Sequence, residues 1–135
     1  MPRNREEWLQ QLVGLLRPYF KEYVGQDIPE KVRVSCGWPS GKAMVTKNRA
    51  LAECFPRRMS VEGYNEIFMS PAVADPMDVA AMLVHELVHA VDDCVNSHKG
   101  KFIEFAKAAG LRRPWTATTP GEALSGVLQI GRAHV

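Results

Sequence analysis

One segment of this 135-residue chain, residues 76–91 (PMDVAAMLVHELVHAV), is apolar around almost its whole circumference when it is drawn as a helix. Asp75 precedes it as an N-cap, Pro76 suits the first helical position, and Asp78 lies where the helix dipole favours a negative charge. The sequence therefore predicts a helix that starts at Pro76 and ends at residue 96 or 97. A helix with so little polar surface must be buried on nearly all sides, so a small domain has to pack around it.

The same segment carries His85, Glu86 and His89 in an HExxH pattern. Residues four apart on a helix share one face, with Cβ atoms about 5–6 Å apart, so both imidazoles can reach one metal ion at about 2.0–2.1 Å. Glu86 is rotated by about 100° from His85 and lies beside such an ion, where a carboxylate can act as a general base. Two imidazoles and a carboxylate are unfavourable to bury unless something satisfies them, as a metal does. The pattern predicts a zinc site that activates water.

A catalytic zinc ion usually has three protein ligands, so the pattern needs one more. His98 is our prediction for the third ligand, because it follows the expected helix end and the chain can turn there to bring its ring back to the pair. Asp93, on the same helix, and Glu104, further along the chain, are the alternatives. With the terminal hexapeptide set aside, His85, His89 and His98 are all the histidines of the chain.

The remaining sequence predicts a small α+β domain. Residues 5–24 have apolar side chains spaced for an amphipathic helix, which Pro18 should bend or divide. Three segments either alternate apolar and polar residues or are bounded by turn-forming residues, as strands are. They are expected to form a three-stranded antiparallel meander: Lys31–Trp38, Arg49–Phe55 and Asn65–Met69. A further helix is expected over Lys101–Ala109, ending at Gly110, and a last one after a capping box at residues 119–122.

Length and composition fit one globular domain. The chain has 46% hydrophobic and 24% charged residues, and 135 residues provide material for a single core. We assign residues 1–129 to this domain and interpret the final hexapeptide, Ile130–Val135, as a non-native tail, because it matches the translation of a sequencing-adapter oligonucleotide. The sequence has neither an apolar run long enough for a membrane span nor a secretory signal, so the expected location is the cytoplasm.

Cysteine usage and charge bear on other classes of function. The three cysteines, Cys36, Cys54 and Cys94, include no CxxC pair, which argues against a disulfide scaffold or a cysteine zinc ribbon and favours reduced packing residues. The net charge of +2 is too small to require a nucleic-acid partner. Basic residues are nevertheless concentrated in the first half of the chain, and some of them could form a basic face on the strand side: Lys42, Lys47, Arg49, Arg57 and Arg58.

These motifs resemble the SprT-like zinc metallopeptidases, in particular the small SprT-like proteins of bacteriophages. The resemblance extends over about Val32–Leu124 and rests on VRVSCGWPS, EIFMSP, MLVHELVHA, HKGKF, AAGL and TATTPGEAL. HExxH occurs in many zinc peptidases, but its combination with H-x-G-x-F at residues 98–102 is more selective. Astacin- and matrixin-like enzymes need a glycine three and a histidine six residues after the second motif histidine, where this chain has Asp92 and Val95.

The resemblance implies a zincin-like fold with a central HExxH helix, zinc held by His85, His89 and His98, and Glu86 as the catalytic base. It implies a zinc metallopeptidase that acts on protein or peptide substrates, with DNA-associated proteins as one class, in the host cytoplasm if a phage encodes it. Cellular members often add a zinc ribbon for which this chain lacks the paired cysteines, so their substrates do not carry over.

A non-catalytic zinc-binding module, associated with nucleic acid or a protein partner, is the alternative function. Glu86 argues against it, because a structural site needs no base and usually fills all four positions with protein ligands. A metal-free helical scaffold is a third reading. The sequence indicates no membrane partner and leaves the oligomeric state open.

Overall fold

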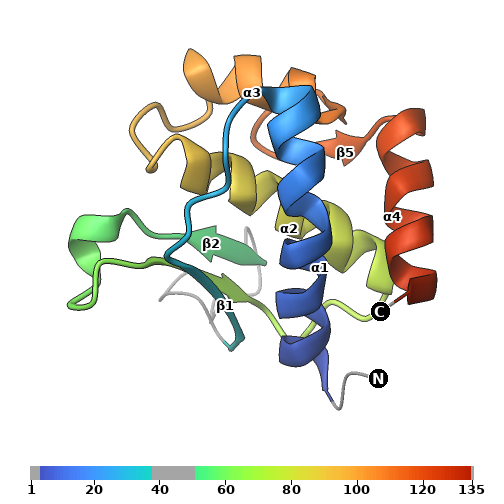
Figure 1. Cartoon of the computed structure of the whole chain (residues 1–135), viewed down its shortest axis with the longest axis horizontal. Coiled ribbons are helices and arrows are strands. Elements are labelled where there is room, and N and C mark those ends of the chain that lie inside the picture. Colours follow the sequence, from blue (N-terminus) through green and yellow to red (C-terminus); the bar gives the residue numbers. More distant parts are fainter. Residues whose placement is uncertain (1–3, 38–50, 135) are drawn as a thin grey trace.

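The computed structural model describes residues 4–37 and 51–134, with the backbone alone at 131–134. Its elements are α1 (Arg5–Tyr19), a π-helical turn (Phe20–Val24), β1 (Val32–Cys36), β2 (Ala52–Cys54), a 3₁₀ turn (Arg57–Met59), β3 (Asn65–Met69), α2 (Pro76–Val91), α3 (Lys101–Ala109), β4 (Leu111–Arg112), β5 (Thr119–Pro120) and α4 (Glu122–His134). Figure 1 shows α2 passing behind α1, with α4 on one side and the sheet of β1 and β2 on the other. The predicted α+β class is confirmed.

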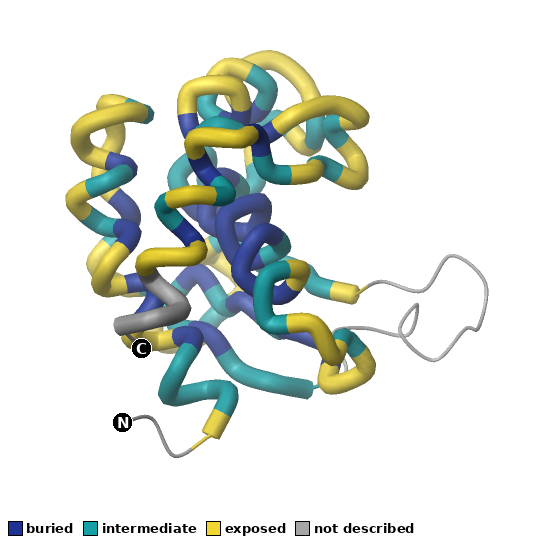
Figure 2. The backbone as a smooth tube through the Cα atoms, turned by 90° about the vertical axis from the view of Figure 1, so that its right-hand side faces the viewer, coloured by how far each residue is buried: buried dark blue, intermediate teal, exposed yellow. Residues whose placement is uncertain are grey.

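Helix α2 lies at the centre of the hydrophobic core. It starts at Pro76, and Met77 N donates to Asp75 Oδ1 at 2.8 Å, as the predicted N-cap requires. Elements α1, α3, α4 and β2 all pack against α2, and Figure 2 shows its backbone as the most continuously buried part of the chain. His85 and Glu86 are only 8% and 7% exposed, so this central helix carries ionisable side chains into buried positions.

Helix α2 ends at Val91, earlier than the sequence predicts. Three residues of the following loop have positive φ angles of 50°, 59° and 54°, which a right-handed helix excludes; they are Asp93, Cys94 and Ser97. Tertiary hydrogen bonds hold this loop, because Asp93 Oδ1 accepts from Arg57 N and from Asn65 Nδ2, each at 2.9 Å. The loop between α2 and α3 is therefore anchored to β3 and to the 3₁₀ turn.

The three predicted strands form one sheet, but the predicted antiparallel meander is wrong. β3 lies in the centre of a mixed sheet in the order β1–β3–β2, with β1 parallel and β2 antiparallel to it. The connection between β1 and β2, residues 37–51, is far longer than a hairpin turn and does not constrain these strands to pair. β3 buries alternate residues, Asn65, Ile67 and Met69, and takes the central position. β2 is thus an outer strand of the described sheet and lies against α2.

The other helices agree closely with the sequence. α1 gives way to the π-helical turn just after Pro18, as expected of a helix that proline divides. α3 has the predicted bounds and ends at Gly110, whose φ is 94°. Thr119 and Pro120 pair with β4 as a short ribbon instead of opening α4. The backbone of α4 continues into the terminal hexapeptide, whose non-native origin stays a prediction. Among the described residues, no helix is both long and apolar enough to cross a bilayer.

The central position of α2 predicts unequal effects for one substitution at two leucines. Leu83 on α2 is fully buried, whereas Leu15 on α1 is 47% exposed. We expect Leu83→Ala to lower the free energy of unfolding by about 2–5 kcal/mol, since it leaves a cavity, and Leu15→Ala to lower it by less than about 1 kcal/mol. Urea denaturation followed by circular dichroism measures both, and equal losses would contradict this packing.

Candidate metal centre

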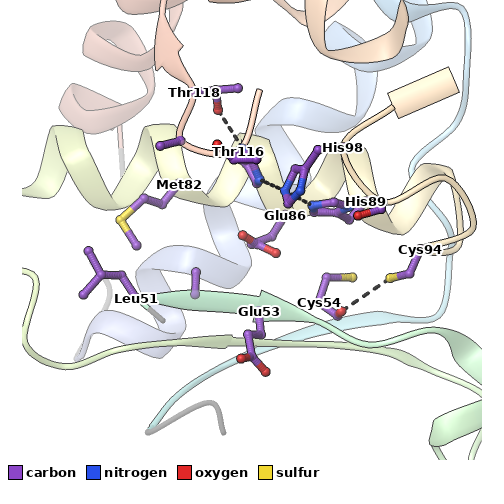
Figure 3. A pocket seen from close by; sticks show the side chains of 14 residues that line it. Leu51, Glu53, Cys54, Met82, Glu86, His89, Cys94, His98, Thr116 and Thr118 are labelled. Carbon is purple, nitrogen blue, oxygen red and sulfur yellow. Dashed lines mark hydrogen bonds between the residues drawn. The ribbon is translucent and has the colours of Figure 1, made fainter. Parts of the chain in front are cut away.

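Three imidazoles converge at one point of the structure, two from α2 and one from the loop that follows it. His98 Nε2 lies 3.3 Å from His85 Nε2 and 3.2 Å from His89 Nε2, and Figure 3 shows the rings of His89 and His98 meeting above Glu86. Two ligands about 2.0–2.1 Å from one tetrahedral ion are about 3.3 Å apart. The two distances from His98 match this value, and the candidate ligand atoms of all three histidines lie within 4.8 Å of one another, which is close enough to hold one ion. In the part of the chain that the structure describes, this is the one cluster of potential ligands close enough to hold a metal ion.

The structure brings His98, rather than either alternative, to the motif histidines. Asp93 is engaged with Arg57 and Asn65 instead. Burial alone would raise the pKa of Asp93, but these hydrogen bonds and the charge on Arg57 together lower it. Glu104 lies on the exposed side of α3, where its carboxylate is 3.6 Å from the ammonium of Lys101. The third position predicted from the sequence thus lies where a third ligand is needed.

Two residues that the sequence did not identify as site residues hold the rings in place. Thr118 Oγ1 lies 2.7 Å from His85 Nδ1; a hydroxyl that accepts from this nitrogen leaves the Nε2 lone pair directed at the metal position. The ring of Phe102 is buried and stacks on the ring of His89, with the ring centroids 4.3 Å apart. Its centroid lies 5.1 Å from the ring centroids of both His85 and His98. One aromatic side chain therefore supports all three imidazoles.

A compact turn delivers His98 from the end of α2. Asp92 Oδ2 accepts from Asn96 N at 2.8 Å, and Asp92 Oδ1 accepts from Asn96 Nδ2 at 2.6 Å. Gly100 then has a φ of 54°, and a Cβ there would lie 3.4 Å from Asn96 Oδ1. That distance is an ordinary contact, so the positive φ, which glycine adopts most readily, is the physical reason for the glycine in the H-x-G-x-F pattern.

Burial sets the charge of the site without a metal. Burial, followed by the other two histidines, lowers the pKa of His85 to about 3, and burial and His98 lower that of His89 to about 4. Burial likewise lowers the pKa of His98. All three rings are thus neutral near pH 7, as metal ligands must be. Burial, followed by Cys94 and Glu53, raises the pKa of Glu86 to about 8, so this carboxyl is mostly protonated there.

The imidazoles open into a cleft of about 610 Å³. Four parts of the chain line it: the outer strand β2, the motif face of α2, the loop that carries His98, and the segment Thr116–Thr118. Figure 3 shows Glu86 projecting from α2 into the space between the histidines and β2, while Glu53 points away on the other side of the strand. A ligand in this cleft would lie between Glu86, the metal position and a strand edge.

The predicted basic face is only partly described. Arg57 and Arg58 are exposed on the 3₁₀ turn, and Arg57 Nε lies 3.6 Å from Asp93 Oδ1. Lys42, Lys47 and Arg49 lie outside the described residues. The described part of the structure therefore gathers two of the five basic residues on one turn, and one of these two helps to anchor the loop.

The comparisons with known proteins add no relative to this picture. Compared with protein-family models, with curated proteins and with solved structures, the chain gives no match in any of the three. The resemblance to the SprT-like peptidases rests on the sequence motifs, and what the site does has to be argued from its own residues.

The convergence of the rings predicts that each histidine is needed for metal binding. We expect His85→Ala, His89→Ala and His98→Ala each to weaken Co²⁺ binding by more than about 100-fold, since each removes one of three ligands. His134→Ala, in the terminal hexapeptide, is the matched control and should leave the affinity unchanged. Titration followed by the visible absorption of Co²⁺ measures this, and tight binding to His98→Ala would remove His98 from the site.

The raised pKa of Glu86 predicts a pH dependence of stability in the metal-free protein. Because its folded-state pKa of about 8 exceeds the ordinary glutamate pKa of 4.5, its contribution to stability is present below about pH 4.5 and is lost as the pH rises to about 8. Glu86→Gln should therefore become more stable relative to the wild type by more than about 1 kcal/mol between about pH 5 and pH 8. Histidine titration is common to both proteins and cancels. Urea denaturation in the presence of a chelator measures the difference, and a constant difference would contradict the burial of this carboxyl.

Proposed function

We propose that this protein is a zinc metallopeptidase of the SprT-like type that hydrolyses peptide bonds in protein or peptide substrates. The observation that carries the proposal is the convergence of His85, His89 and His98 beside Glu86 in an open cleft. Three imidazoles suit zinc, and a site with three protein ligands keeps a fourth position for water or substrate, as catalytic zinc sites do.

The reaction divides between the metal and Glu86. Bound zinc polarises the scissile carbonyl and makes water more acidic. Glu86 projects into the cleft, so its carboxylate can take a proton from the attacking water and deliver it to the departing amine nitrogen. The pKa of Glu86 is raised to about 8 in the metal-free protein, and a dication held by the neighbouring histidines would favour its ionised form. Glu86 would then act as a base in the loaded protein and as an acid in the second half of the reaction.

The backbone of β2 offers a binding place for an extended substrate. Next to the two ends of β2, Leu51 O accepts from Ser70 N at 2.8 Å and Phe55 N donates to Glu66 O at 2.9 Å. In an antiparallel pair, the N–H and C=O groups of successive residues point alternately toward the partner strand and away from it. The backbone groups of Ala52 and Cys54 therefore point away from β3. A peptide that adds to this outer strand passes the metal position across the cleft and gains main-chain hydrogen bonds at Ala52, and at Cys54 O once it displaces the Cys94 thiol that donates there. This geometry favours unfolded or flexible segments, because the added strand has to be extended with its main-chain groups unpaired.

DNA-associated proteins are one substrate class within this proposal, and the cytoplasm is its location. The basic residues described on the 3₁₀ turn are too few to argue that DNA is required. Three free cysteines are consistent with a reducing compartment. The substrate panel should therefore include an unfolded protein alone and a DNA-binding protein with and without DNA.

The role of Glu86 predicts a separation of binding from turnover. Glu86→Gln should keep about one zinc ion per chain and lose at least about 100-fold of the rate at which the zinc-loaded wild type cleaves unfolded casein, since it removes the base. Glu104→Gln is the control, because this exposed carboxylate lies away from the cleft. Metal analysis of the purified proteins and gel-based cleavage assays measure both properties.

The opposite outcomes distinguish the alternative functions. A wild type that binds one zinc ion but cleaves no member of the substrate panel would favour a non-catalytic zinc-binding module. Cleavage that survives in Glu86→Gln would remove Glu86 from the mechanism. A protein whose folding and metal content are both unchanged by chelators would favour the metal-free scaffold.

A further inference from the structure

Two cysteines meet at the end of the cleft nearest His89. Cys54 lies on β2 and Cys94 in the loop after α2, 40 positions apart in sequence. Cys94 Sγ donates to Cys54 O at 3.4 Å, and Cys54 Sγ donates to the next carbonyl, Phe55 O, at 3.8 Å. Figure 3 shows the sulfur atoms facing each other across the gap between the strand and the loop. This proximity was not predictable from the sequence, because the two residues come from separate elements.

The surrounding structure keeps these thiols in place and accessible. Cys94 N donates to His89 O at 2.9 Å, and the residue before it is anchored to β3 through Asn65. Both cysteines line the cleft, so a small reagent that enters it meets both sulfur atoms. Cys36 is placed differently: it lies on β1, at the opposite side of the sheet from β2, and does not line the cleft.

We propose that Cys54 and Cys94 are an oxidisable dithiol pair that hydrogen peroxide converts to an intramolecular disulfide. One sulfur attacks a peroxide oxygen, which breaks the O–O bond and gives a sulfenic acid and one water. The second sulfur then attacks the sulfenic sulfur, so that the S–S bond forms and the hydroxyl leaves with a proton as a second water. Two thiols are thereby oxidised, and one peroxide is reduced to two waters.

The disulfide would join the outer strand to the loop that presents His98. Cys94 lies between the Asp93 anchor and His98, so a covalent bond to Cys54 fixes this loop against the edge of the cleft. It also removes the thiol that caps the Cys54 carbonyl. This inference concerns the modification of two residues and does not depend on the proposed peptidase activity.

Mapping of the oxidised protein tests this assignment. The full chain is treated with a small molar excess of hydrogen peroxide, and unreacted thiols are then labelled with a maleimide. We expect two of the three thiols to be lost, the mass of the unlabelled chain to fall by about 2 Da, and a digest to contain one peptide joined through Cys54 and Cys94. Cys36→Ser should give the same cross-link, whereas Cys54→Ser and Cys94→Ser should give none.

The wild-type protein also supplies a control for the role of the fold. Oxidation in concentrated urea should distribute cross-links among all three cysteines, since the fold no longer selects a pair. A native protein in which Cys36 takes part in the main disulfide, in which chains are joined to one another, or in which both cleft thiols survive would overturn the proposal. None of these readouts depends on the folding of a variant.

Discussion

The burial of His85 and Glu86, with His89 partly buried beside them, on a largely apolar helix is the constraint on which the rest of the structure depends. The other faces of α2 are covered by α1, α3 and α4, so its ionisable face has to meet the cleft and β2. The pKa shifts show how the fold tolerates this arrangement without a metal: the histidines are neutral and Glu86 retains its proton, which leaves little charge in a poorly solvated place. Such a site suits a cation for two reasons. The neutral histidines already offer unprotonated nitrogen lone pairs, and a nearby dication would favour the ionised form of Glu86 over the protonated one.

The ring of Phe102 makes the arrangement of the imidazoles a property of the core. It is fully buried on α3, and it contacts all three rings. His85 is fixed further by Thr118, which reaches it from the segment before α4. Four separate parts of the chain thus determine three nitrogen positions. This convergence favours a preorganised site over one that assembles around the metal, because the ordering of the side chains accompanies folding.

The features that could be predicted from the sequence are those with local causes. Asp75 and Pro76 specify the start of α2, Gly110 specifies the end of α3, and the HExxH spacing places two rings on one face. The sheet order was not predictable, because the pairing of β1 with β3 joins segments that are distant in the chain and leave no short-range signal. The roles of Thr118 and Phe102 were missed for the same reason, although both lie in motifs on which the resemblance to the SprT-like peptidases rests. The early end of α2 was missed because it has no helix-breaking residue as its cause. It is associated instead with the tertiary hydrogen bonds that Asp93 accepts.

That early end has a structural consequence for the third ligand. If α2 continued to residue 96 or 97, His98 would lie further along the helix axis, away from His85 and His89. The hydrogen bonds from Arg57 and Asn65 to Asp93 replace this continuation with a loop that turns back over the motif. The position of His98 is therefore set by a contact with β3 as well as by its own sequence neighbours. Because metal binding would hold His98 against α2, it would also stabilise the attachment of the loop to the sheet, so metal affinity and the stability of this contact are thermodynamically linked.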